Sequence, residues 1–446
     1  MSARSVIINI LLFASWIISA QESNFITVDK ETYQLYSDKE WTTLIEKGNQ
    51  AIKSGFDYYY LRMRLGIAYY EKHNYIKASR HFKKALTFNE NDPVALEYLY
   101  YACLLLGKYD CARFISKDFN DALRIKTGSS EKKFVEQINA EYLFNNCLTD
   151  NIVSNAGNYF PADLTGYQIV TRDFHNFSLS ASHPIGHRFS LFHGYTYLNK
   201  TDFHHYNDGI YIINNLDYAI RQHQYYVTLS TTFRNNWVIS PSIHLLTYSY
   251  PLINSISTGG LKGVQVSYNT VNDYGLVTGL SVLKSAGIAD IRFASHYTFL
   301  NDKEYFQNLM GITIFPLGNL NLYLGGDIAT NFQLISEKNI QPVFHVFLGF
   351  SMFEKLWMEF SGTIGEIQNF TESNGYYIYN SLDAIRQKGN LTVLIPFDRK
   401  GSVVYLGSKF SRHESQPYPI SESVATQSNL IQYDSYSIYG GISWKL

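Results

Sequence analysis

Serine and histidine, the pair of residues that forms an activated nucleophile in many hydrolases, are adjacent twice in this chain, at Ser182-His183 and Ser295-His296. A nucleophile and its base must lie within hydrogen-bonding distance. Both pairs fall in segments of alternating polarity, where neighbouring side chains point to opposite faces of a strand. Neither pair can therefore make that contact. No other catalytic constellation and no phosphate-binding glycine loop is recognisable, so we expect no enzyme activity and no cofactor.

Histidine and cysteine could also bind metal, but their spacing does not favour it. His204-His205 lies in a polar segment expected to be a loop, where such a pair is more often solvated than metal-bound. Three cysteines, an odd number, exclude a complete disulfide framework. Cys103 and Cys111 could pair across two helices, but small apolar core residues are the favoured interpretation for both. We expect no metal site.

The composition favours a membrane wall over a soluble enzyme. Charged residues make up 17% of the 446 residues and aromatic residues 16%, including 37 Tyr and 29 Phe. Average proteins are about a quarter charged, and tyrosine suits a wall between headgroups and water. The net charge of -1 gives no global field for nucleic acid, so no nucleic-acid partner is expected. After the first twenty residues, no apolar run is long enough to cross a bilayer as a helix.

The first twenty residues predict a signal peptide. Arg4 gives a basic start, residues 6–20 form a short apolar run, and Ala20 is a small residue after which cleavage is expected. A membrane anchor is the alternative, although the run is short and a polar segment follows at once.

Residues 36–125 follow a helical period. Large, small and aromatic side chains recur in an order that resembles the tetratricopeptide repeat, in which small residues let paired helices approach and large ones fill the groove. A second copy begins at Pro93 and a weaker half-repeat precedes the first, giving about two and a half repeats. A generic helical hairpin is the alternative. The residues that carry the resemblance are Leu65, Gly66, Tyr69, Ala78, Phe82 and Ala85.

From residue 134 to 446, apolar residues recur at every second position, as in Leu320–Ile328, which is the pattern of membrane barrel strands. Short turns alternate with longer polar segments, and a soluble β-sandwich or propeller is the alternative. The predicted fold is α plus transmembrane β: a short helical segment, then an antiparallel barrel of about fourteen strands with both ends in the periplasm. The longer connections are expected near 146–168, 200–217, 251–270, 371–385 and 412–427.

The last eight residues continue the alternation, with Ile442 on the apolar side. Their pattern resembles the C-terminal assembly signal of bacterial outer-membrane barrels, although the last position of that family is usually Phe or Trp. The resemblance implies an outer-membrane location, lipid contact and the barrel-assembly machinery as a partner. It rests on Tyr439, Gly441, Trp444 and Leu446.

If the apolar faces of the strands meet lipid, the alternate residues face the lumen. Charges of both signs there could line a water-filled channel. In the other interpretation, Arg292 or Lys409 pairs with an acidic residue and closes the pore. The charged and histidine candidates for the lumen are His244, Arg292, His296, Asp327, His345, Glu359 and Lys409.

The layout as a whole resembles the outer-membrane porins that export exopolysaccharides such as cellulose and poly-N-acetylglucosamine, which carry longer repeat arrays. The first hypothesis is a channel or export portal whose periplasmic repeats recruit a protein partner. The second is a plugged barrel that anchors the repeats as a scaffold. The third and least favoured is a barrel enzyme acting on lipid.

Overall fold

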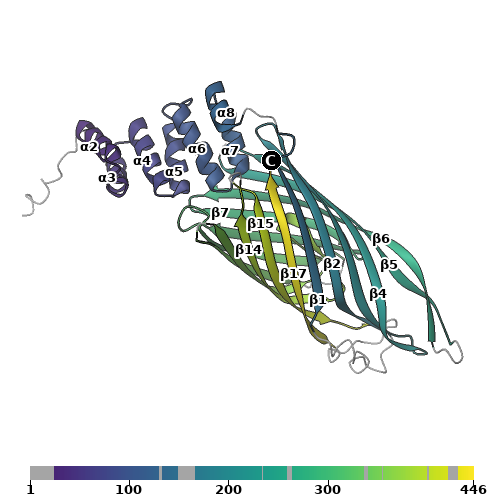
Figure 1. The fold of residues 1–446 in the computed structure, drawn as a ribbon. Coiled ribbons are helices and arrows are strands. Elements are labelled where there is room, and N and C mark those ends of the chain that lie inside the picture. The colour runs from purple at the N-terminus through teal and green to yellow at the C-terminus, as the bar shows by residue number, and fades with distance from the viewer. Residues whose placement is uncertain are drawn as a thin grey trace, which may run out of the picture.

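The computed structural model has a row of helices at one end of a closed β-barrel (Figure 1). It describes residues 25–129, 133–148, 166–233, 235–258, 264–335, 340–353, 355–398, 401–419 and 430–446. The predicted signal peptide, residues 1–20, lies outside this set. Within the described residues, none of the helices is both long enough and apolar enough to cross a bilayer.

The helical segment begins at Phe25, earlier in the chain than the expected start at residue 36. From α2 to α7 each helix packs against the next, and α8 packs against α6. The described helices are α2 (Phe25–Ser37), α3 (Trp41–Lys53), α4 (Tyr59–Glu71), α5 (Tyr75–Ala85), α6 (Pro93–Leu105), α7 (Tyr109–Ser116) and α8 (Asp121–Thr127).

Small residues set the distance between paired helices. A Cβ atom built on Gly66 of α4 would lie 2.6 Å from the ring of Phe82 of α5. A Cβ atom on Gly48 of α3 would lie 2.8 Å from Cδ2 of Leu65. Phe82 and Leu65 are fully buried, so each large side chain occupies the space left by a glycine on the facing helix.

Cys103 and Cys111 form a disulfide with their Cα atoms 5.8 Å apart. The favoured interpretation of both as free core residues was therefore wrong. The α6–α7 turn brings the two cysteines together, because Gly107 adopts a left-handed conformation with φ of 68° and reverses the chain between them. Cys147 is a buried free cysteine.

The barrel closes because β1 pairs with both β2 and β17. Fourteen described strands make up the closed wall, all antiparallel, which confirms the expected number. They are β1 (Gln137–Cys147), β2 (Gly166–Ile185), β3 (Phe189–Asn207), β4 (Ile212–Thr232), β5 (Trp237–Thr258), β6 (Val264–Ala286), β7 (Ala289–Leu300), β8 (Lys303–Ile314), β9 (Leu322–Gln333), β10 (Gln341–Met352), β11 (Leu356–Ile367), β14 (Ala384–Pro396), β15 (Val403–Ser415) and β17 (Ile431–Lys445). A short β16 (Tyr418–Pro419) adds to the free end of β2.

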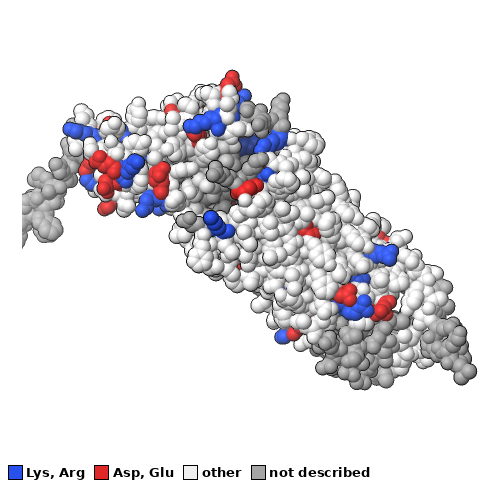
Figure 2. Space-filling model, in the orientation of Figure 1, with Lys and Arg blue, Asp and Glu red and all other residues white. Residues whose placement is uncertain are grey.

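The two faces of the wall differ in polarity as a membrane barrel requires. Outward side chains such as Leu245 and Trp444 are each 53% exposed. Inward side chains such as Gln307, Asn331 and Ser435 have no exposed surface. Figure 2 shows a largely uncharged wall, with charges gathered on the helices and toward the opposite end. We treat the barrel as membrane-spanning on this pattern.

Two of the expected long connections are largely strand. β3 continues to Asn207 and β4 starts at Ile212, while β5 continues to Thr258 and β6 starts at Val264. The predicted loops at 200–217 and 251–270 were therefore wrong over most of their length. The backbone hydrogen bonds between two strands continue even where both faces of the strand pair are polar. In such a segment apolar residues no longer alternate, so the sequence pattern does not indicate a strand.

Candidate functional site

The connection from β11 to β14 folds into the lumen. It was predicted as a long outer loop at 371–385. We call residues 368–383 the luminal hairpin, which contains β12 (Phe370–Glu372), the 3₁₀ turn η2 (Ser373–Gly375) and β13 (Tyr377–Tyr379). The turn has left-handed φ angles of 50°, 58° and 85° at Ser373, Asn374 and Gly375. Asn and Gly tolerate this conformation best.

Wall side chains bind backbone carbonyls at the tip of the luminal hairpin. The hydroxyl of Tyr226 donates to the Asn374 carbonyl at 3.0 Å. The Nδ1 atom of His244 lies 2.8 Å from the Gly375 carbonyl, and because a carbonyl only accepts, this nitrogen carries the hydrogen. His296 lies against the same glycine: a Cβ atom on Gly375 would be 3.3 Å from its ring. Two predicted lumen histidines therefore contact the hairpin.

Amide side chains bind the two edges of the hairpin. Gln307 of β8 donates to the Thr371 carbonyl at 2.8 Å and accepts from the Thr371 amide at 3.0 Å. This two-bond contact repeats what a neighbouring strand provides. Asn301, in the β7–β8 turn, donates to the Asn380 carbonyl at 2.9 Å. The hairpin is thus paired to the wall on both sides by neutral groups.

A buried carboxylate holds the base of the hairpin. Asp383, 1% exposed, accepts hydrogen bonds from the Tyr433 hydroxyl and from Thr171. His413 Nδ1 lies 3.2 Å from the same carboxylate. A buried carboxylate is stable only when its oxygens are bonded, and three wall strands supply those bonds.

The charge on the hairpin itself is also compensated. Glu372 of β12 accepts from Lys388 of β14 at 2.5 Å and from the Tyr379 hydroxyl at 2.9 Å. Lys388 also donates to that hydroxyl at 2.7 Å. The three groups form a closed network inside the lumen.

The luminal hairpin lies between two cavities. Along β4, the cavity under the helices reaches Thr232, the hairpin tip contacts Tyr226, and a second cavity is lined by Gln222 and Tyr218. β5 shows the same order from Val238 to Tyr248. We call them the helix-end cavity, about 1030 Å³, and the loop-end cavity, about 640 Å³. Ligand sites usually have volumes of about 300–1,000 Å³. The helix-end cavity is at the upper end of this range and the loop-end cavity is within it.

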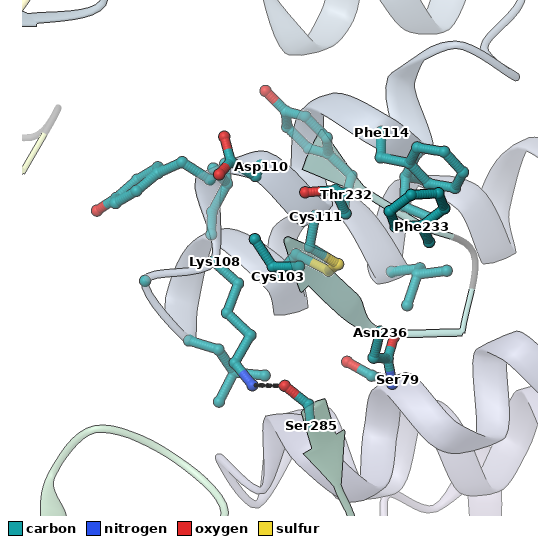
Figure 3. Close-up of a pocket in the computed structure, with 18 of the residues that line it drawn as sticks. Ser79, Cys103, Lys108, Asp110, Cys111, Phe114, Thr232, Phe233, Asn236 and Ser285 are labelled. Atoms are coloured by element: carbon teal, nitrogen blue, oxygen red, sulfur yellow. Dashed lines mark hydrogen bonds between the residues drawn. A yellow bond between two sulfur atoms is a disulfide. The ribbon is translucent and has the colours of Figure 1, made fainter. Parts of the chain in front are cut away.

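The helix-end cavity lies between the helices and the barrel mouth (Figure 3). The disulfide of Cys103 and Cys111 lines it from the helical side, and Thr232 and Phe233 line it from the barrel. Lys108 crosses from the α6–α7 turn to the barrel, where it donates to Ser285 at 2.7 Å and pairs with Asp290 at 2.8 Å. The helices therefore cover the mouth and leave a cavity beneath them.

Other contacts fasten the helices to the rim. Arg113 of α7 pairs with Glu136 at 3.2 Å. The amide of Ile76 donates to the Gly318 carbonyl in the β8–β9 turn at 3.1 Å. Lys83 of α5 donates to Asn236. Burial, with Lys108 and Lys284 nearby, lowers the pKa of Lys83 to about 8.

The other predicted lumen residues form two groups. Arg292 lies 3.3 Å and His345 3.2 Å from the two oxygens of Asp327. Glu359 accepts from the Tyr323 hydroxyl at 2.7 Å. Arg292 is therefore paired with an acidic residue across the wall. Lys409 instead lies over the Tyr439 ring at 5.8 Å and lines the loop-end cavity.

The Ser-His pairs do not make nucleophile–base contacts. His183 Nε2 lies 3.0 Å from His193 Nε2, and Ser295 donates to Asn308 at 2.7 Å. His204 is a strand residue of β3 stacked on Tyr218, with ring centroids 3.8 Å apart; its assignment to a loop was wrong. Within the described ranges, no three His, Cys, Asp or Glu side chains group as metal ligands do.

The residues of the predicted assembly signal lie on both faces of β17. Trp444 and Leu446 are exposed on the outside. Tyr439 points inward and donates to Asn390 at 2.8 Å. Gly441 leaves room for the Tyr405 ring, whose Cζ would lie 2.5 Å from an added Cβ.

Sequence reasoning missed the residues that hold the luminal hairpin. Gln307, Asn301 and Asp383 were not singled out, because one amide in an alternating strand looks like an ordinary lumen residue, and single polar residues in a turn or a loop look solvated. The one local signal is Ser373-Asn374-Gly375, a run typical of a tight turn, which indicates a hairpin but not its direction.

No family model and no curated protein sequence matches this chain. Among solved structures, the toluene transporter TodX of P. putida overlaps 76% of this chain and 94% of its own, at 8% identity and a TM-score of 0.44. A Pseudomonas aeruginosa FadL homologue overlaps 70% and 90%, at 8% identity and a TM-score of 0.42. The Ralstonia pickettii toluene transporter TbuX overlaps 70% and 90%, at 8% identity and a TM-score of 0.43. Overlap at this level gives no information about the ligand of the present chain.

Proposed function

We propose that this protein is an outer-membrane channel for small solutes in which the luminal hairpin is the gate. The observation that carries the proposal is the position of the hairpin between two cavities inside a polar lumen. A solute that enters the loop-end cavity reaches the helix-end cavity only if the hairpin moves. In this proposal the helices lie in the periplasm, on the same side of the membrane as the first and last residues of the barrel.

The polar lumen supports a channel over a lipid-directed enzyme. The bonds between wall and hairpin use amides, hydroxyls and paired charges, and such groups can exchange their partners for water when the hairpin moves. One Ser–His contact lies in the described wall: Ser435 Oγ is 2.9 Å from His413 Nε2, whose Nδ1 lies 3.2 Å from Asp383. Ser435 has no exposed surface and also accepts from Asn145 at 3.1 Å, so we assign this group to the base of the hairpin. Export of a long polysaccharide would require the whole hairpin to leave the lumen, so a small solute fits the geometry better.

A plugged barrel that serves as a scaffold is the second candidate. The helices farthest from the barrel expose Phe25, Tyr33 and Tyr60, which are 49%, 56% and 63% exposed. Arg64 lies 5.3 Å from the Tyr33 ring and 5.9 Å from the Tyr60 ring. Exposed aromatic residues with arginine are enriched where proteins bind each other. This favours recruitment of a periplasmic partner by helices of the tetratricopeptide type.

Single-channel conductance in planar bilayers tests the gate. Replacing residues 369–382 with a short Gly-Ser connection removes the hairpin but leaves Asp383 and the wall strands. We expect the conductance to rise about tenfold or more, since the hairpin lies between the two cavities. The control variant lacks residues 25–129 and keeps the hairpin; it should conduct as little as the intact protein.

The outcomes separate the two candidates. No conductance from a folded hairpin-deleted barrel would overturn the gate and leave the scaffold. Folding is checked independently by the resistance of the barrel to unfolding in cold detergent. Equal conductance of the intact and hairpin-deleted proteins would also contradict the proposal.

A further inference from the structure

We propose that the loop-end cavity is a binding site for a neutral, polyhydroxylated ring, a sugar of one or two units. This deepens the proposed function, since the ligand would be the solute held outside the gate. The proposal rests on two features of the cavity wall: a continuous row of aromatic rings and buried amide groups with free hydrogen-bonding capacity.

The aromatic row crosses four strands at the loop end. His204 stacks on Tyr218 at 3.8 Å with an interplanar angle of 13°. Tyr218 stacks on Tyr250 at 6.3 Å, and Tyr250 on Tyr248 at 6.2 Å. Tyr167 continues the row beyond His204 at 6.4 Å. All five rings line the cavity, so its wall offers aromatic C–H and hydroxyl groups together.

Two buried amides face the cavity with one polar atom unused. Gln222 is 2% exposed, and its Oε1 atom accepts from Asn380 at 3.0 Å, which leaves Nε2 without a partner among the described residues. Asn145 is 3% exposed, and its amide nitrogen donates to Ser437 at 2.8 Å. Its Oδ1 atom has no partner among the described residues. The bonds already made fix the orientation of both amides. The cavity therefore presents one oriented donor and one oriented acceptor.

These two groups decide between ligand classes. A hydrocarbon would cover the amides without pairing them, and an unpaired buried polar group is unfavourable. A hydroxyl both donates and accepts, so the hydroxyls of a sugar of one or two units can pair with Gln222 or Asn145 while its C–H groups contact the rings. The wall thus favours a polyol over a hydrocarbon of the same size.

The charged groups of the cavity do not favour an ionic ligand. Lys200 pairs with Asp202 at 3.1 Å, and Lys388 pairs with Glu372 at 2.5 Å. Lys409 lies over the Tyr439 ring, a cation–π contact. Asp273 accepts from Tyr248 at 3.1 Å, and Asp302 lies exposed in the β7–β8 turn. A charged ligand that paired with the buried groups would have to displace one of these contacts. The cavity volume of about 640 Å³ accommodates a small ligand with bound water.

Isothermal titration of the full chain in detergent tests the proposal with cellobiose and maltose as probes and with toluene and benzoate as comparison ligands. We expect at least one disaccharide to bind, and Gln222→Leu and Asn145→Leu each to weaken it about tenfold. Tyr218→Leu should weaken it by a similar factor. The matched controls are Asn308→Leu and Tyr225→Leu, which change the same residue types on the outer face of the wall.

The result that overturns the proposal is binding of toluene or benzoate but of neither disaccharide, or disaccharide binding that the three cavity variants leave unchanged. Where a leucine variant does not fold, Gln222→Asn, which keeps an amide but retracts it, provides the same comparison. Failure of the gate proposal can be distinguished from failure of the binding-site proposal. Disaccharide binding without conductance in the hairpin-deleted barrel supports the site and contradicts the channel, and the reverse supports the channel alone.

Discussion

The lumen is closed at two levels by different means. At the helix end, a separate helical segment covers the mouth through side-chain pairs such as Lys108 with Asp290 and Arg113 with Glu136. Inside the barrel, the luminal hairpin is part of the wall connection itself, and neutral amides and hydroxyls hold most of it. One closure depends on partly buried charge pairs at the rim, whose side chains are 12–31% exposed, and the other on hydrogen bonds within the lumen.

The difference predicts different responses to the surroundings. Salt screens the charge pairs at the rim to the extent that water reaches them, with a screening length of about 8–10 Å at physiological ionic strength, whereas enclosed neutral hydrogen bonds are little affected. The helices can therefore be loosened by salt while the hairpin stays in place. The two closures are separable, and each has variants that affect it alone.

The largest effect is expected from Asp383, which holds the base of the hairpin. In Asp383→Ala, His413, Tyr433 and Thr171 lose their shared acceptor. Breaking such a buried network costs about 3–5 kcal/mol, so the hairpin should leave the wall far more often. Hydrogen exchange of the amides of residues 370–379 measures this, and protection should fall by about two orders of magnitude or more.

Asp434→Ala is the matched control for that change. Asp434 of β17 pairs with Arg412 of β15 at 2.9 Å. The pair is partly exposed on the outer side of the two strands that carry Tyr433 and His413. Its loss should change hairpin protection by less than about threefold. Equal loss of protection in both variants would mean that Asp383 stabilises the whole barrel rather than the hairpin.

The second effect concerns the helices. In Gly66→Leu, the new side chain would occupy the position of the Phe82 ring, which an added Cβ alone approaches to 2.6 Å. Overpacking of this kind destabilises by about 1–3 kcal/mol. Thermal unfolding followed by circular dichroism should show the helical transition at lower temperature, with the strand transition unchanged. A shift of both transitions would show that barrel stability depends on the docked helices.

The same contrast explains what the sequence could predict. Alternation between Leu320 and Ile328 and the pair Gly66 and Phe82 are local patterns, so the barrel, its strand number and the paired helices could be read from them. The luminal hairpin depends on contacts between Gln307 and Thr371 or Asn301 and Asn380, which are distant in sequence. A polar loop satisfies its backbone equally well in water or against a polar lumen, and only the folded wall decides between them.

The third effect tests charge at the rim. Lys108→Ala removes the pair with Asp290 and the bond to Ser285. We expect about 1 kcal/mol of docking free energy to be lost, which is about a fivefold rise in the undocked population. Spin labels on α4 and on the β6–β7 turn detect the undocked population as a second distance between the labels. In the intact protein, this population should also grow with salt.

Lys126→Ala is the control for the rim variant. Lys126 pairs with Glu97 within the helical segment at 2.7 Å and is 63% exposed, so docking should not change. Undocking that is independent of both Lys108 and salt would show that the rim is held by backbone and apolar contacts, and the contrast with the hairpin would then disappear.

The last effect, which is absent at pH 7, comes from His81 of α5, which is 6% exposed and stacks on Tyr69 at 5.3 Å. Burial, with Arg62 and Arg80 nearby, lowers the pKa of His81 to about 4 from an ordinary value near 6.5. Between these values the unfolded segment binds the proton and the folded segment does not, so stability falls as the pH drops from about 6.5 toward 4. At pH 7 the effect is absent.

The helical transition should therefore move to lower temperature across this window, with a loss on the order of 2 kcal/mol. His81→Phe keeps a ring against Tyr69 and cannot be protonated, so its helical transition should shift much less. His73→Phe, on the same segment but at an exposed turn, should follow the intact protein. If His81→Phe loses as much stability in acid as the intact chain, other groups in the segment titrate on unfolding, and acid sensitivity no longer follows from this buried histidine.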